Sequence, residues 1–148
     1  MSTRSTIAIE LADGTVEQIY NHSDGYLGYT GKVLLNHYSD PVKLQQLIAQ
    51  GSMSMLGKEI GEKINFNDRM NYESDYIAAQ CRFYARDRGE PLVVEEFKDF
   101  ADYKENHQCE EFEYILRDVN GTSTWFVSPY GDYVKLANAI ALEEQEES

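Results

Sequence analysis

Two turn signals, one near each end of the chain, most constrain how this sequence can fold. Asn120-Gly121 is the pair preferred in two-residue type I′ turns, and the flanking residues alternate between apolar and polar. A two-residue turn at this pair sets Leu116 opposite Trp125. It also sets Tyr114 opposite Val127, on the same face. The sequence therefore predicts a β-hairpin with one buried face.

A second hairpin is predicted near the N-terminus. Asp13-Gly14 is a strong turn pair, and apolar residues alternate on both sides of it. If the turn consists of these two residues, Leu11 lies opposite Val16 and Ile7 lies opposite Tyr20. This hairpin also gains one buried face.

Helices are expected between and after the hairpins. Asp40 as N-cap and Pro41 at the first helical position mark one start. Further helices are predicted after Thr30 as N-cap, over residues 94–106, and after Asp132 as N-cap.

The length of 148 residues fits one domain. We expect an α+β domain over residues 1–148, with an antiparallel sheet built from the two hairpins and packed with helices. A further strand is predicted around residues 79–86. The acidic tail, residues 143–148, is expected to fray.

The charge is strongly negative and unevenly distributed. Twenty-six acidic residues against 13 basic ones give a net charge of −13, and residues 1–58 contribute almost none of it. This charge repels nucleic acid and anionic membranes and attracts basic surfaces. We therefore expect no direct nucleic-acid partner and no membrane partner. No apolar run suits a signal peptide or a membrane span, so a cytoplasmic location is expected.

Acidic residues are concentrated between residues 90 and 113. If 94–106 is helical, acids three or four positions apart lie about 5–6 Å apart, close to the roughly 7 Å spacing of DNA phosphates. Such a row could imitate a phosphate edge, whereas the alternative is a solvated face that serves solubility. The predicted partner-binding residues are Glu95, Glu96, Asp99, Asp102 and Glu105, with Tyr103 as an aromatic anchor.

The chain offers a second hypothesis, a small-ligand module for a nucleotide, a phosphate or a metal. Its candidate residues are His22, Asp24 and Tyr26 in one loop, and Arg82, Arg86 and Arg88 in another segment. The alternative is that Asp87 and Glu90 pair with these arginines and hold the segment in shape.

Catalytic and metal-binding motifs do not stand out. His22, Asp24, His37 and Asp40 match no established metal-ligand spacing, so no metal is predicted. Neither cysteine has a recognisable catalytic partner pattern, and no phosphate-binding loop occurs. We expect neither a cofactor nor an enzymatic activity.

The N-terminal pattern of Ser2–Ile9, Asp13-Gly14 and Ile19–Tyr26 resembles the opening of small, largely uncharacterised acidic proteins of tailed bacteriophages and prophages. Residues 86–90 form a second patch of resemblance, and Ser23 stands where such proteins usually have an aromatic residue. The resemblance implies a protein that binds and blocks a host or defence enzyme that handles nucleic acid. Its acidic surface would then occupy the basic groove of that partner.

Overall fold

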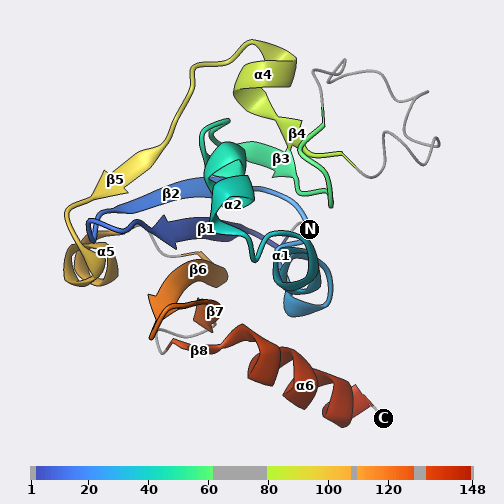
Figure 1. Cartoon of the computed structure of the whole chain (residues 1–148). Coiled ribbons are helices and arrows are strands. Elements are labelled where there is room, and N and C mark those ends of the chain that lie inside the picture. Colours follow the sequence, from blue (N-terminus) through green and yellow to red (C-terminus); the bar gives the residue numbers. More distant parts are fainter. Residues whose placement is uncertain (1–2, 62–79, 108–109, 129–132, 148) are drawn as a thin grey trace.

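A mixed β-sheet organises the chain, and β1 (Ser5–Glu10) lies near its centre (Figure 1). The structure is a computed structural model, and it describes residues 3–61, 80–107, 110–128 and 133–147. The main strand order is β4-β3-β2-β1-β6-β7-β8, and β5 also pairs with β2. The remaining strands are β2 (Val16–Asn21), β3 (Met53–Met55), β4 (Arg82–Phe83), β5 (Glu95–Phe97), β6 (Phe112–Val119), β7 (Thr122–Ser128) and β8 (Val134–Lys135).

The C-terminal hairpin is confirmed in its register. β6 and β7 pair with Leu116 opposite Trp125 and Tyr114 opposite Val127. Both turn residues, Asn120-Gly121, have positive φ angles, as a type I′ turn requires.

The N-terminal hairpin forms, but its predicted register was wrong by one residue. Ile7 lies opposite Ile19, and Val16 lies opposite Glu10. The loop contains three residues, because the Leu11 amide donates to the Thr15 carbonyl at 2.8 Å. Gly14 supplies the left-handed conformation, with φ of +92°, that such a loop needs in its last position.

The predicted purely antiparallel sheet was also wrong. β1 pairs with β6 in parallel, from Ser5 opposite Phe112 to Ile9 opposite Leu116. β2 and β3 also pair in parallel. The two hairpins therefore lie side by side and form one mixed sheet within an α+β fold.

The helices match the predictions unevenly. They are the π-helical turn η1 (Leu27–Gly31), α1 (Lys32–His37), α2 (Pro41–Ile48), α4 (Tyr84–Arg88), α5 (Phe100–Asn106) and α6 (Leu136–Glu147). The start of α2 is confirmed, since Asp40 Oδ1 accepts from the Val42 amide at 3.0 Å. Thr30 does not cap α1, because its hydroxyl instead donates to the Asp24 carbonyl. None of these helices within the described ranges is long and apolar enough to cross a membrane.

The single helix predicted over 94–106 is replaced by a strand and a shorter helix. β5 pairs with β2, which places Phe97 opposite Val16, and α5 starts only after Asp99. The strand predicted over 79–86 shrinks to β4, and α4 follows it at once. Residue 79 and the predicted N-cap Asp132 lie outside the described residues. α6 runs to Glu147 and so includes most of the tail that we expected to fray.

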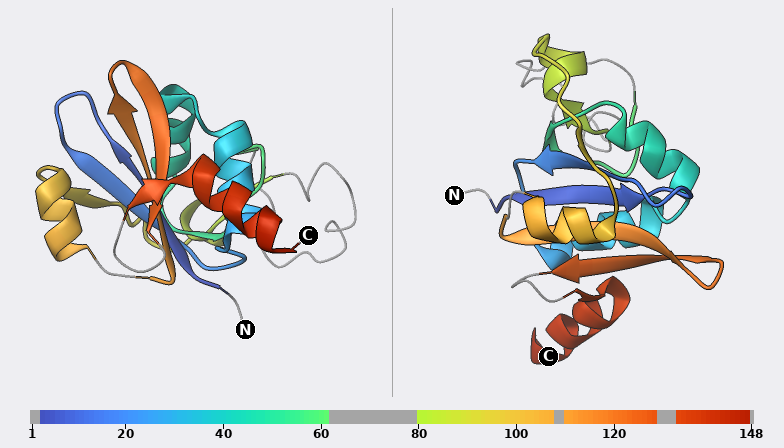
Figure 2. Two further views of the ribbon diagram at one scale, coloured as in Figure 1. Left: turned by 90° about the horizontal axis from the view of Figure 1, so that it is seen from below. Right: turned by 90° about the vertical axis from the view of Figure 1, so that its left-hand side faces the viewer.

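Two hydrophobic cores lie on opposite faces of the sheet (Figure 2). On one face, α1, α2 and α6 cover β-strand residues such as Ile7 and Leu116. On the other face, α5 covers Ala8, Val16 and Ile115. The sheet is therefore the middle layer, and α5 lies alone among the described helices on its face.

We predict that Gly121→Ala lowers the free energy of unfolding by about 1–2 kcal/mol, because a Cβ is disfavoured at positive φ. A Cβ at this position meets no atom within 4 Å, so the cost comes from the backbone alone. Thermal unfolding measures the effect. Gly28→Ala is the control, since a Cβ there has ordinary contacts of 3.5 Å or more. Equal melting temperatures for Gly121→Ala and the wild type would contradict the prediction.

Candidate binding surface

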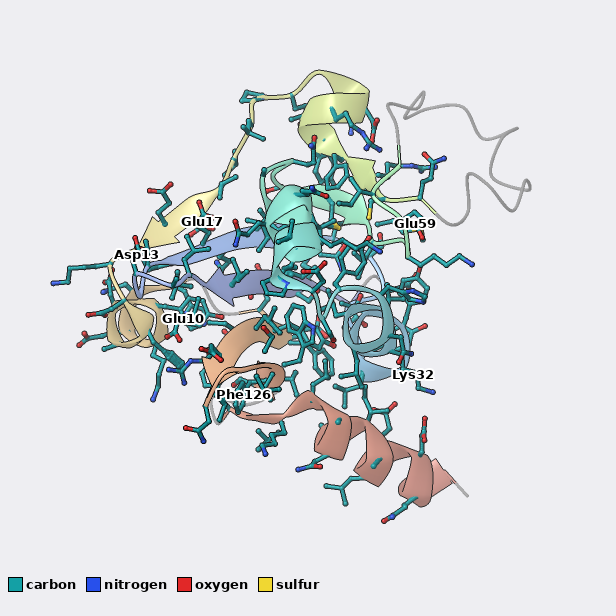
Figure 3. The ribbon with its side chains drawn as sticks, viewed as in Figure 1. Glu10, Asp13, Glu17, Lys32, Glu59 and Phe126 are labelled. Carbon is teal, nitrogen blue, oxygen red and sulfur yellow. The ribbon has the colours of Figure 1, made fainter. Side chains whose placement is uncertain are left out.

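The β1–β2 turn, β5 and α5 lie together at one end of the molecule (Figure 1), and these segments are rich in acidic residues. Asp13 and Glu17 occupy this end on the hairpin (Figure 3). We call this surface the acidic corner. Its residues are Asp13, Glu17, Glu95, Glu96, Asp99, Asp102 and Glu105.

The acidic corner contains two glutamates that oppose each other directly. Glu17 on β2 pairs with Glu96 on β5. Opposed side chains on antiparallel strands have Cβ atoms about 4.5–5.5 Å apart, and like charges at this separation are destabilising. Partial burial, followed by the charges of Glu96 and Asp13, raises the pKa of Glu17. The fold thus holds several carboxylates closer together than stability alone favours.

Two further acids cap α5. The Asp99 carboxylate accepts from the Asp102 amide at 2.8 Å. The Asp102 carboxylate accepts from the Lys98 amide at 2.8 Å and from Asn106 Nδ2 at 2.6 Å. The bond from the Lys98 amide and then that from Asn106 lower the pKa of Asp102. The Asp102 carboxylate is therefore charged, and the hydrogen bonds hold both carboxylates in fixed orientations.

The predicted helical row of acids does not form. Because residues 95–97 are a strand, Glu95 and Glu96 point to opposite faces of the sheet. Glu96 lies beside Glu17, whereas Glu95 lies beside Gln18. The predicted acids therefore lie on both faces near the sheet edge instead of in a line along one helix.

The predicted anchor Tyr103 was wrong, because its side chain is fully buried. Its ring stacks on His107 with centroids 4.2 Å apart and meets Phe97 edge-on at 5.5 Å. Tyr103 holds α5 on the sheet and cannot contact a partner.

A buried ion pair that the sequence did not reveal secures the end of α5. His107 Nε2 donates to Glu113 Oε2 at 2.6 Å, and both side chains are almost fully buried. The other ring nitrogen, Nδ1, faces the Tyr103 carbonyl. Since each ring nitrogen faces an acceptor oxygen, this site favours the doubly protonated imidazole. Tyr133 donates to the second Glu113 oxygen at 3.2 Å.

The pKa of His107 reflects this environment. Burial, the largest influence, would lower it, but the hydrogen bond and charge of Glu113 together with the Tyr103 carbonyl raise it above 6.5. The pair lies inside the molecule, so we interpret it as the support that positions the acids of α5.

The segment with Arg86 and Arg88 agrees with the alternative interpretation, in which neighbouring acids pair with the arginines and hold the segment in shape. Arg86 Nε donates to Asp87 Oδ1 at 2.9 Å, and its other nitrogens donate to the carbonyls of Ile60, Gly61 and Cys81. Arg88 lies 3.6 Å from Glu90. Arg82 is buried, and burial lowers its pKa. The contacts of Arg86 and Arg88 thus stabilise the local chain.

Of the loop residues predicted to bind a ligand, His22 has an internal partner at its side chain and Asp24 has one at its backbone carbonyl. His22 Nδ1 is bonded to the Tyr20 hydroxyl at 2.8 Å, and the Asp24 carbonyl accepts from Thr30. Tyr26 is 44% exposed. Within the described parts of the chain, no three His, Cys, Asp or Glu side chains cluster as a metal site would require.

We predict that Glu96→Gln raises the free energy of unfolding by about 0.2–1 kcal/mol at neutral pH, because it removes the repulsion with Glu17. Urea unfolding measures the change. Glu111→Gln, an exposed site away from β5, is the control and should leave stability nearly unchanged. A loss of stability in Glu96→Gln would show that the two glutamates do not repel.

We also predict a pH dependence from His107. Its pKa is raised in the folded state, so the stabilisation is complete below pH 6.5 and is lost as the pH rises through the folded pKa. The free energy of unfolding should therefore fall as the pH rises above 6.5 and through the folded pKa of His107. In Glu113→Gln the fall should be smaller, as measured by urea unfolding across this pH range. An identical fall in both proteins would contradict this assignment.

Comparisons with protein-family models, curated proteins and solved structures give no match to this chain.

Proposed function

We propose that this chain is a binding protein whose acidic corner occupies a basic, nucleic-acid-binding groove on another protein. The observation that carries the proposal is the direct opposition of Glu17 and Glu96. A neutral residue at either position would remove a repulsion, so the charge is costly to the fold. A binding role for the charge accounts for that cost, whereas acids placed for solubility need not oppose one another.

The composition of the acidic corner supports a cationic partner. Seven acids come from the β1–β2 turn, β2, β5 and α5, and the two lysines of this region are Lys98 and Lys104. Lys104 lies over the ring of Phe100 at 5.6 Å. A surface with this excess of negative charge accelerates encounters with basic proteins.

The geometry also supports imitation of nucleic acid. Glu17 on β2 and Glu96 on β5 lie directly opposite each other, so their Cβ atoms are about 4.5–5.5 Å apart. From Cβ atoms this close, the flexible side chains can place their two carboxylates at the roughly 7 Å that separates successive phosphates of a DNA strand. The buried pair of His107 and Glu113 fixes α5, so that its acids keep their positions relative to β5. Binding then requires little ordering of the surface.

The resemblance of the N-terminus to small acidic phage proteins suggests that the protein acts in an infected bacterial cell. In an infected bacterial cell, the partner would be a host or defence protein that handles nucleic acid. Occupying its groove would block access of the nucleic acid, and no catalytic step is involved.

We predict that Glu96→Lys combined with Glu105→Lys weakens partner binding by about tenfold or more, because two attractive contacts become repulsive. Neither of these glutamates caps α5 as Asp99 does, so the fold should persist. The control combines Glu59→Lys with Glu111→Lys, which makes the same change in net charge at exposed sites elsewhere.

The measurement is affinity capture from bacterial lysate at about 50 and 300 mM salt, a range over which exposed charges become screened. We expect the wild type and the control to retain a nucleic-acid-binding protein at low salt and to release it at high salt. Added duplex DNA should displace it. Equal capture by the Glu96→Lys and Glu105→Lys double variant, or binding indifferent to salt and to DNA, would overturn the proposal.

A further inference from the structure

A groove of about 540 Å³ lies between the tips of the two hairpins. The β1–β2 and β6–β7 tips extend side by side from the same end of the sheet (Figure 2). Residues 10–12 form one wall, and Arg117 and Asp118 form the other. Pro41 and Gln45 of α2 also line it.

The groove exists because the parallel pairing of β1 and β6 ends early. The last pair is Ile9 opposite Leu116. β6 continues to Val119, paired with β7 alone, while β1 enters its turn after Glu10. The two hairpins therefore separate beyond this pair and leave an inner edge of β6 facing β1.

Backbone hydrogen-bonding groups point into this groove. In a two-residue hairpin, the residues that flank the turn, here Val119 and Thr122, exchange backbone hydrogen bonds. Hydrogen-bonded and non-hydrogen-bonded pairs alternate along an antiparallel ladder, so the next residue, Asp118, turns its N–H and C=O away from β7. On the opposite wall, the Leu11 amide donates to Thr15. Because a trans peptide points its C=O opposite to its N–H, the Glu10 carbonyl faces the groove.

We propose that this groove binds an extended, basic peptide segment, which adds as a short strand beside Asp118. A volume of about 540 Å³ lies within the range of ligand sites. The edge at residues 117–119 is about 10 Å long, enough for three residues of extended chain. Main-chain pairing at such an edge is an established mode of peptide recognition.

Negative charge at the mouth of the groove favours a basic peptide. Asp118 is exposed at the mouth of the groove, and Asp13 is exposed on the adjoining turn. Arg117 also lines the groove, but its guanidinium is bound to Glu10 at 3.2 Å and lies 3.7 Å from the ring of Phe100. A lysine or arginine of the peptide therefore meets carboxylate charge at the mouth.

The experiment selects peptides from a displayed library of random heptapeptides against the full-length protein. Selected peptides are synthesised, and their affinities are measured by fluorescence anisotropy. Gln45→Trp fills the groove with an indole, and Gln46→Trp is its matched control. Both glutamines are exposed on α2, and Gln46 does not line the groove. Circular dichroism checks that both variants are folded.

We expect the selected peptides to be rich in Lys, Arg and β-branched residues and to bind Gln45→Trp about tenfold more weakly than the wild type. Binding to Gln46→Trp should be unchanged. N-methylation of alternate peptide amides should abolish binding, because it removes the donors that pair with the sheet edge. The Glu96→Lys and Glu105→Lys double variant should keep the groove and its peptide binding, because neither residue lines the groove. This variant therefore separates the test of the groove from the test of the acidic corner.

Three results would overturn the proposal. The first is that no selected peptide distinguishes Gln45→Trp from Gln46→Trp. The second is that acidic peptides are selected in place of basic ones. The third is that N-methylated peptides bind as well as their parents, which would show a side-chain site instead of strand addition.

Discussion

The parallel pairing of β1 with β6 is the constraint on which the rest of the structure depends. It joins the two hairpins into one sheet and so creates the two faces that the helices cover. It places Ile115 beside Ala8, in the core on which α5 packs. Its early end at Leu116 opens the groove between the hairpin tips. The acidic corner and the groove are thus two results of the same arrangement of strands.

Local chemistry made parts of this fold predictable. The type I′ turn at Asn120-Gly121 determines its own register, and Asp40 with Pro41 defines the start of α2 without help from distant residues. The N-terminal hairpin shows the limit of such signals, because Asp13-Gly14 suits both a two-residue and a three-residue loop. The addition of one loop residue moved every cross-strand pair.

The candidate site was less predictable, because it depends on contacts between distant segments. Residues 95–97 have a helix-compatible sequence and become a strand only because β2 offers a free edge to Phe97. The opposition of Glu17 and Glu96 follows from that pairing, so no local pattern could reveal it. His107 was equally hidden, since its role requires Glu113 on another element. The acids themselves were visible in the sequence, but their arrangement was not.

The distance along the chain between β1 and β6 has a consequence during synthesis. Glu10 and Arg117, which meet at the end of this pairing, are 107 positions apart. At a translation rate of about 5–20 residues per second, β6 is synthesised roughly 5–20 seconds after β1, with which it pairs. Throughout that interval the inner edge of the N-terminal hairpin is open to other strands. That edge is therefore open to wrong pairing until β6 has been made.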